Sequence, residues 1–247
     1  INCEDEPYIA VGLGCAIGVM RHPFAGTLPD GAQDFVFPPV GRDIKRRLDE
    51  VVRGVRWHRI AEPFAVGYGT FAIDSVKLTD HWILQENETW NKGRTVGADV
   101  TADAPARVAR NMKLPEVSGA PLSVCPFVLA SRYPNGAVAV STIGRNVGRE
   151  YVTEKVAVSI SVDRWDIPIG LFGYFKEVTM VFPSPLKTGK HTVFAQDLAG
   201  ENPVDITSNV VIKDNRLIIP GEVISRVGLM NASEGDCSDP GMVIRVM

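Results

Sequence analysis

The stretch of sequence that decides the fold is residues 192–224, TVFAQDLAGENPVDITSNVVIKDNRLIIPGEVI. Short runs of β-branched and aliphatic residues alternate here with turn sequences such as Ala199-Gly200-Glu201-Asn202-Pro203 and Lys213-Asp214-Asn215-Arg216. Strands of a few residues at this spacing are typical of an antiparallel β-sandwich. We expect strands at Thr192–Asp197, Val204–Ile206, Val210–Ile212, Leu217–Ile219, Val223–Ile224 and Met242–Val246.

These strands span about sixty residues, whereas a complete sandwich typically has about 100. We therefore expect Val156–Val162 and Glu177–Val181 to complete the two sheets. The two prolines of Phe182-Pro183-Ser184-Pro185-Leu186 predict a stiff linker. The domain boundary is predicted near Gly148, with a partial α/β barrel-like domain at residues 1–148 and a C-terminal β-sandwich domain at residues 149–247.

The first part of the chain contains one clear helical pattern. Asp43–Arg59 has the 3.6-residue apolar period of an amphipathic helix, and Pro63 ends whatever continues past Ile60. The apolar stripe is predicted to face the core, and the charged residues are predicted to lie on a solvated face. The stripe comprises Ile44, Leu48, Val51, Val52 and Val55, and the charged set comprises Lys45, Arg46, Arg47, Glu50 and Arg53.

Strand patterns surround this helix. Strands are predicted at Tyr8–Val11, Thr70–Ile73, Trp82–Gln85, Val124–Ser131 and Ala137–Ile143. The last two flank Arg132-Tyr133-Pro134-Asn135-Gly136, whose Pro, Asn and Gly predict a hairpin turn. Such mixing indicates an α/β unit too short for a complete (β/α)₈ barrel of roughly 250 residues. A part-barrel has exposed strand edges, so we expect a missing N-terminal half or a partner chain to cover them.

The overall composition excludes several classes of protein. The 247 residues are 45% hydrophobic, as in globular domains and unlike disordered chains. The net charge is −3, and no clustered basic excess is visible in the sequence, so nucleic acid is not expected as the main partner. The longest weakly polar run, Tyr8–Met20, is shorter than the roughly 20 residues of a membrane span.

No cofactor or metal is predicted from the motifs. Gly12, Gly14 and Gly18 follow an apolar run, but a dinucleotide fingerprint needs its third glycine at position 17. The alternative is that these glycines allow close packing of a buried segment. His22, His58 and His81 lack the spacing of a metal site, and the scattered cysteines predict neither a zinc site nor a disulfide framework.

Acidic and aromatic residues point to carbohydrate chemistry. Glu4, Asp5 and Glu6 directly precede a buried apolar segment, and paired carboxylates perform glycoside hydrolysis. Trp57, Trp82 and Trp90 offer apolar faces on which a sugar ring can stack. The alternatives are that the acids lie in a solvated loop and that each Trp belongs to the core.

Three further stretches resemble a known group of proteins. Gly41–Val52, Ala130–Ala137 and Ala195–Gly200 with Val204–Thr207 are together similar to the later part of certain bacterial glycoside hydrolases, in which a (β/α)₈ barrel precedes a C-terminal antiparallel β-sandwich. The resemblance implies that part of the barrel lies outside this chain. It also implies a polysaccharide or oligosaccharide substrate and a secreted or periplasmic location.

The leading hypothesis is therefore that the chain is a glycoside hydrolase or a C-terminal fragment of one. One alternative is a non-catalytic carbohydrate-binding or cell-surface module. The other is a structural sandwich protein without a small ligand. In barrels, working residues lie on the loops that follow the strands. Glu4 and Asp5 are the catalytic candidates. The residues predicted to bind sugar are Arg21, His22, Asp74, Trp82, Arg132 and Tyr133, with hairpin decoration as the alternative for the last two.

Overall fold

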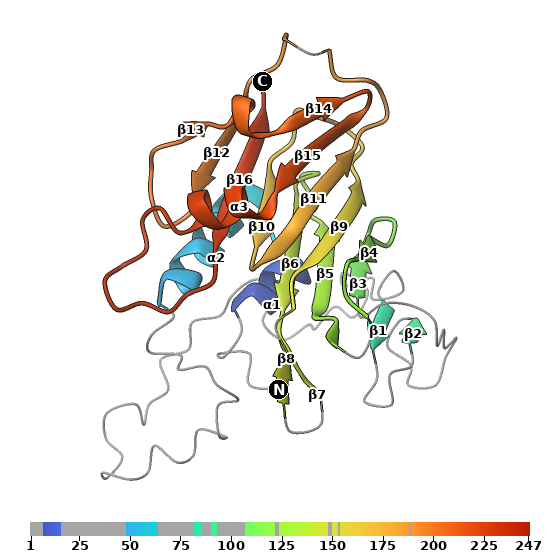
Figure 1. The fold of residues 1–247 in the computed structure, drawn as a ribbon, viewed down its shortest axis with the longest axis vertical. Coiled ribbons are helices and arrows are strands. Elements are labelled where there is room, and N and C mark those ends of the chain that lie inside the picture. The colour runs from blue at the N-terminus through green and yellow to red at the C-terminus, as the bar shows by residue number, and fades with distance from the viewer. Residues whose placement is uncertain are drawn as a thin grey trace.

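The computed structural model describes residues 7–15, 48–63, 82–84, 90–92, 107–121, 124–147, 150–152, 154–187 and 189–247. The main elements of this part of the chain are two mixed β-sheets (Figure 1). The seven-stranded sheet has the order β13 (Val204–Asp205), β12 (Val193–Asp197), β16 (Gly241–Val246), β10 (Ile169–Phe172), β6 (Val138–Ile143), β5 (Phe127–Arg132) and β3 (Arg107–Arg110). The five-stranded sheet has the order β14 (Val211–Lys213), β15 (Arg216–Pro220), β11 (Phe175–Val181), β9 (Val156–Ser161) and β4 (Glu116–Ser118).

Two short ladders lie beside these sheets. β1 (Trp82–Leu84) pairs with β2 (Trp90–Lys92), and β7 (Arg145–Val147) pairs with β8 (Glu150–Val152), both antiparallel. The two large sheets share one hydrophobic core. Alternate residues point into it, which is why Val138, Val140, Ile169, Leu171 and Ile244 of one sheet and Val158, Ile160, Val178, Met180 and Leu217 of the other are all buried.

Helices α1 (Pro7–Gly12) and α2 (Leu48–Ala61) cover the other face of the seven-stranded sheet. The hydroxyl of Ser141 in β6 donates a hydrogen bond to the Tyr8 carbonyl oxygen at 2.9 Å, which holds α1 on the sheet. The ring of Trp57 in α2 meets that of Phe172 in β10, with centroids 5.8 Å apart. All six residues of β6 are buried because both faces of the sheet are covered.

The third helix, α3 (Gly221–Gly228), contacts strands of both sheets: β11 and β15 of one, β12 and β16 of the other. Its first residue must be glycine because a Cβ there would lie 1.8 Å from the Phe175 carbonyl oxygen. Val223, Ile224 and Val227 are buried on the inner side of this helix. The helix therefore closes one end of the core between the sheets.

The strand registers define two ends of the molecule. One end, here called the loop end, contains the turn from β5 to β6, residues 162–168, residues 182–192 and the β14–β15 turn. The opposite end, here called the anchor end, contains residues 197–203 and 229–240, which follow β12 and α3. Helix α2 has 14 residues, about 21 Å, and so matches the roughly 20 Å length of a six-residue strand. It reaches from the anchor end to the loop end, where Asn135 donates to the Ile60 carbonyl oxygen.

Most of the predicted strands are confirmed, but two are wrong. Tyr8–Val11 lies in α1 and Val223–Ile224 lies in α3. A short apolar run can form either a strand or a helix. Here each run buries only one of its sides, against strands that already pair with one another, and a helix satisfies this requirement. The hairpin is confirmed, with the Tyr133 N–H donating to the Ala137 carbonyl at 2.8 Å. Predicted strand Thr70–Ile73 lies outside the described residues.

The predicted face of the amphipathic helix is also wrong. The described part of this helix buries Glu50 and Arg53 completely, whereas Leu48 is 62% exposed and Val52 is 40% exposed. The charged side chains can be buried because hydrogen-bond partners from two loops meet them, so their desolvation is offset. Apolar periodicity therefore predicted the helix correctly but predicted its buried side incorrectly.

The fold class is confirmed only as β-rich. The sheets are mixed rather than antiparallel, since β3 and β5, β6 and β10, and β9 and β11 pair in parallel. The strands on either side of the predicted boundary near Gly148 pair within the same sheet, as β6 with β10 and β4 with β9 do. In the described part of the chain, this boundary therefore does not separate the two sheets, and the strands form no part-barrel.

The predicted linker Phe182–Leu186 is packed against the β14–β15 turn. Phe182 and Leu186 are buried, and their N–H groups donate to the carbonyl oxygens of Asn215 and Asp214. The two ends of the segment are therefore held in the core, while Pro183, Ser184 and Pro185 between them are exposed. In the described part of the chain, no helix has the length and hydropathy needed to cross a membrane.

Gly170→Ala tests the close approach of α2 to the sheet. A Cβ at this position would lie 2.7 Å from Phe172 Cε2 and 2.9 Å from the Trp57 ring. We expect the free energy of unfolding to fall by about 2–3 kcal/mol, the cost of overpacking a core. Gly136→Ala is the matched control, because its Cβ meets nothing within 4 Å and only its φ of 88° is strained, at about 1 kcal/mol. Urea denaturation measures both, and a larger loss for Gly136→Ala would contradict the packing argument.

Candidate functional site

Two groups of polar residues in the described structure are candidate sites. The first, here called the α2 anchor, joins α2 to the loops of the anchor end. It consists of Asp49, Glu50, Arg53 and Arg56 on α2 with Asp197, Asn231, Ser233, Asp236 and Asp239 on the loops. The second, here called the Trp165 surface, lies at the loop end and consists of Arg132, Asp163, Arg164, Trp165, Asp166 and His191.

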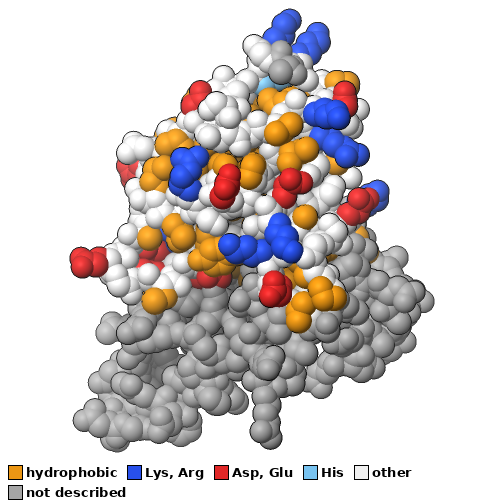
Figure 2. All heavy atoms as spheres, in the orientation of Figure 1, with side chains coloured by type: hydrophobic (Ala, Val, Ile, Leu, Met, Phe, Trp, Pro, Cys, Tyr) orange, Lys and Arg blue, Asp and Glu red, His pale blue; other side chains and the backbone are white. Residues whose placement is uncertain are grey.

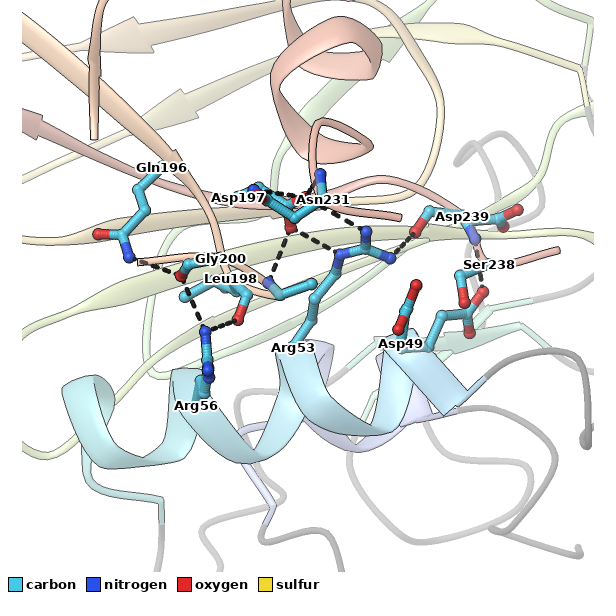
Figure 3. Close-up of polar contacts among 12 residues, drawn as sticks. Asp49, Arg53, Arg56, Gln196, Asp197, Leu198, Gly200, Asn231, Ser238 and Asp239 are labelled. Atoms are coloured by element: carbon cyan, nitrogen blue, oxygen red, sulfur yellow. Dashed lines mark hydrogen bonds and ion pairs between the residues drawn. The ribbon is translucent and has the colours of Figure 1, made fainter. Parts of the chain in front are cut away.

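The centre of the α2 anchor is a buried ion pair. Arg53 Nε lies 2.9 Å from Asp197 Oδ1, and both side chains are fully buried (Figure 3). The Asp197 carboxylate also accepts hydrogen bonds from the N–H of Ala199 at 2.8 Å and of Asn231 at 2.7 Å. Arg53 reaches this carboxylate past Gly241, where a Cβ would lie 2.7 Å from Arg53 Cδ. One carboxylate thus connects α2, the turn after β12 and the loop after α3.

The first turn of α2 is held in the same way. Asp49 accepts hydrogen bonds from the Ser233 N–H at 2.6 Å and the Ser233 hydroxyl at 2.9 Å. Glu50 Oε1 accepts the N–H of Asp239 at 2.7 Å. Both acids lie at the helix N-terminus, where negative charge is favoured by the helix dipole. The loop 231–239 therefore serves as the partner of the helix start.

The remaining cation of the anchor bonds to backbone oxygens. Arg56 Nη1 donates to the carbonyl oxygens of Leu198 at 3.2 Å and Gly200 at 2.8 Å (Figure 3). Gln196 also donates to Gly200, at 2.9 Å. These bonds fix the turn that follows β12.

Burial affects the pKa values of two side chains in this region, Tyr8 and Arg53. Burial raises the pKa of the Tyr8 hydroxyl well above 10, and the charge of Glu50 adds to the effect. Burial is the largest influence on the pKa of Arg53 and by itself would lower it, but the hydrogen bond to Asp197 together with the other interactions with Asp197 and Tyr8 raises this pKa above its ordinary value. Tyr8 therefore stays protonated and donates to the Asp239 carbonyl oxygen at 2.8 Å, while Arg53 stays charged. The α2 anchor acts as a structural joint.

The Trp165 surface differs in being accessible to solvent. Its loop, residues 163–166, connects β9 to β10. The Arg132 guanidinium binds Asp163 through two bonds of 2.9 Å, and Arg164 binds Asp166 through two more of 2.9 Å. The side chains of these four residues are 31–66% exposed. The hydrogen bond from Arg164 lowers the pKa of Asp166.

An aromatic pair lies beside these ion pairs. The rings of Trp165 and His191 meet edge to face, with centroids 4.7 Å apart and an interplanar angle of 64°. Both residues are partly exposed, and Trp165 packs against the core on its inner side. Among the described residues, none forms a hydrogen bond with His191 Nδ1. A partly buried indole with carboxylates and guanidinium groups nearby combines an apolar face with directional polar groups.

Of the predicted sugar-binding residues whose side chains the structure describes, it brings one into this surface. Arg132 belongs to it, whereas the neighbouring Tyr133 is 2% exposed and donates to the Val11 carbonyl oxygen at 2.6 Å. Tyr133 therefore packs beneath the hairpin. Its contact with sugar stays a prediction, and its burial does not favour such a contact. Trp82 begins β1. The other candidates, Glu4, Asp5, Arg21, His22 and Asp74, lie outside the described residues, and their roles stay predictions.

Sequence reasoning missed most of the Trp165 surface. A signal was present in Asp163-Arg164-Trp165-Asp166, where an aromatic residue stands among three charges between two predicted strands. Such a residue is expected at the surface, because burying its charged neighbours would cost a large desolvation free energy. His191 had no comparable signal, since only tertiary structure places it against Trp165.

The alternative explanation of the glycines is confirmed at Gly12. A Cβ there would lie 2.2 Å from Ser141 Oγ and 2.4 Å from Leu129 Cβ, so this glycine allows α1 to pack closely on the sheet. Among the described residues, no three His, Cys, Asp or Glu side chains are grouped as metal ligands would be. Comparison of the chain with protein-family models, with curated proteins and with solved structures gives no match.

Asp197→Ala tests the α2 anchor. Removing one member of a buried pair leaves the other charge uncompensated, so we expect a loss of about 3–5 kcal/mol in the free energy of unfolding. The double variant Arg53→Met with Asp197→Ala removes both charges and should be more stable than the single variant Asp197→Ala. The free energies of unfolding of the wild type, both single variants and the double variant, measured by urea denaturation, form a double-mutant cycle. Strictly additive losses would show that the pair is not coupled.

The pKa of His58 predicts a dependence of stability on pH. Burial lowers this pKa from 6.5 to about 4 in the folded protein. Between these two values the unfolded chain binds the proton more readily, so stability is complete above pH 6.5 and falls as the pH decreases to 4. Because the imidazole is partly exposed, we expect this contribution to be about 1–2 kcal/mol.

His58→Gln should flatten the dependence of the free energy of unfolding on pH between 6.5 and 4, measured by urea denaturation at several pH values. Arg59→Gln is the control, because it alters the exposed next residue of α2 without removing a group that titrates in this range. An unchanged slope in His58→Gln would contradict the assignment.

Proposed function

We propose that the chain binds carbohydrate without catalysing its hydrolysis, and that the Trp165 surface is the binding site. The observation that carries this proposal is the edge-to-face contact of Trp165 with His191 beside the Arg132–Asp163 and Arg164–Asp166 pairs. The same combination of an aromatic face and flanking polar groups is what a sugar ring requires.

The chemistry of the surface matches the two kinds of group on a sugar. The C–H face of a pyranose is apolar and can lie on the exposed part of the Trp165 indole. Sugar hydroxyls both donate and accept, so they can donate to the carboxylates of Asp163 and Asp166 and accept from Arg132 and Arg164. Each guanidinium is already aligned by two bonds to its carboxylate, which lowers the conformational cost of binding.

This function is the alternative that the sequence left open, a non-catalytic β-sandwich module. The face-to-face packing of the two mixed sheets supports the sandwich part of that prediction, with a parallel component that the sequence did not predict. A secreted or periplasmic location is part of the same proposal. Glycoside hydrolase activity, a missing N-terminal half or partner chain, and the roles of Glu4 and Asp5 stay predictions.

Trp165→Ala tests the binding site. We expect affinity for a bound oligosaccharide or polysaccharide to fall at least about tenfold, because the variant removes the stacking face and uncovers polar groups around it. The measurement is isothermal titration calorimetry or affinity gel electrophoresis, after a panel of neutral and acidic polysaccharides has identified a ligand.

Phe127→Ala is the matched control for this variant. Phe127 is another partly buried aromatic residue, but it lies at the start of β5, at the anchor end. Thermal unfolding of both variants separates loss of binding from loss of fold. If Trp165→Ala binds like the wild type, or if only its stability changes, the site lies elsewhere.

A further inference from the structure

The loop end carries a group of basic residues that the sequence does not reveal. The segment 182–187 lies against the β14–β15 turn through three hydrogen bonds. The N–H of Phe182 donates to the Asn215 carbonyl oxygen at 2.8 Å, the N–H of Leu186 donates to the Asp214 carbonyl oxygen at 2.9 Å, and Asn215 Nδ2 donates to the Phe182 carbonyl oxygen at 2.8 Å. These bonds place Lys187 close to the turn that carries Lys213 and Arg216.

Four side chains form this group, here called the basic edge: Lys187, Lys190, Lys213 and Arg216. All four are exposed, and none forms an ion pair with a described residue. In residues 182–187, 189–192 and 211–217, Asp214 is the only acidic residue. A chain whose net charge is −3 thus has a local positive excess at this end.

Figure 2 shows the same distribution on one face of the molecule. Lys and Arg side chains project at the upper end, over the region of β14 and β15 in Figure 1, and few acidic side chains lie among them. On the rest of the coloured surface of this face, basic and acidic side chains are intermixed. The excess is therefore a feature of the loop end.

The basic edge is continuous with the Trp165 surface. Lys190 directly precedes His191, whose ring lies 4.7 Å from that of Trp165. The N–H of Lys190 donates to the Lys187 carbonyl oxygen at 3.1 Å, so the two lysines share one turn. A ligand on Trp165 that extends across His191 would therefore meet Lys190 and Lys187.

We propose that the carbohydrate bound by this chain is an acidic polysaccharide, with the Trp165 surface holding one sugar ring and the basic edge pairing with the carboxylates of neighbouring units. This inference rests on the proposed function. The lysines have no carboxylate partner within the described structure, so they keep their charge available to a polyanion. A polymer with a regular array of charges can contact several of them at once.

The surface favours a polysaccharide over a nucleic acid. The carboxylates of Asp163 and Asp166 beside Trp165 can accept hydrogen bonds from the hydroxyls of a sugar ring, whereas the phosphates next to a stacked base have no hydrogen to donate to them. A nucleic-acid interface also needs a larger basic excess than four cations on a chain of net charge −3.

The test uses polygalacturonate as the acidic polymer, dextran as a neutral polymer and single-stranded DNA as a polyphosphate. The variant is Lys187→Ala with Lys190→Ala. At low salt we expect its affinity for polygalacturonate to fall about tenfold or more. We also expect a weaker salt dependence, with the magnitude of the slope of log affinity against log salt smaller by about two. The control, Lys155→Ala with Arg226→Ala, removes the same charge from exposed positions at the anchor end and should bind like the wild type.

The outcomes separate this inference from the proposed function. Tight binding of polygalacturonate that both Trp165→Ala and the double lysine variant weaken supports both. Binding of dextran as tight as that of polygalacturonate, weakened only by Trp165→Ala, overturns the acidic ligand and keeps carbohydrate binding. Tighter binding of DNA than of either polysaccharide overturns both, and so does an absence of binding to all three polymers and to the wider polysaccharide panel.

Discussion

The ion pair between Arg53 and Asp197 is the contact on which the helical layer of this protein depends. It connects α2 to the end of β12, and the same carboxylate holds the loop after α3 through Asn231. A buried pair of this kind contributes little net stability compared with apolar packing, but the loss of one partner is costly. The pair therefore specifies one position of α2 on the sheet. Gly241 is part of this specification, because any side chain there would occupy the path of Arg53.

The anchor divides the molecule into two ends with different properties. At the anchor end, buried acids and arginines bond to loop backbone, and α3 closes the core between the sheets. At the loop end, charged side chains remain exposed and pair only in part. A rigid anchor end leaves the loop end free to carry surface chemistry, since loops on a fixed scaffold can display side chains without supporting the core. The proposed carbohydrate site lies at this end.

The strands were largely predictable because alternation and turn chemistry are local. The hairpin around Asn135 and Gly136 and the turn at Asp214 and Asn215 follow directly from residues that accept tight-turn conformations. Helices α1 and α3 were missed because a short apolar run buries equally well as a helix laid on a sheet or as a strand within it. For the candidate site, Arg132 was predicted and Trp165 was not, although its charged neighbours pointed to the surface.

By itself, the sequence determined that this chain is β-rich, where most strands after Phe127 lie and that a helix precedes Pro63, since each of these follows from near neighbours along the chain. Tertiary structure decided which side of α2 is buried. Glu50 and Arg53 are inside because Asp239 and Asp197, more than 140 residues away, supply their partners. It also decided where charge accumulates: Lys187 and Lys213 are separate in sequence, and backbone hydrogen bonds between their segments bring them to one end. Desolvation and charge depend on all neighbours in space, and the fold sets those neighbours.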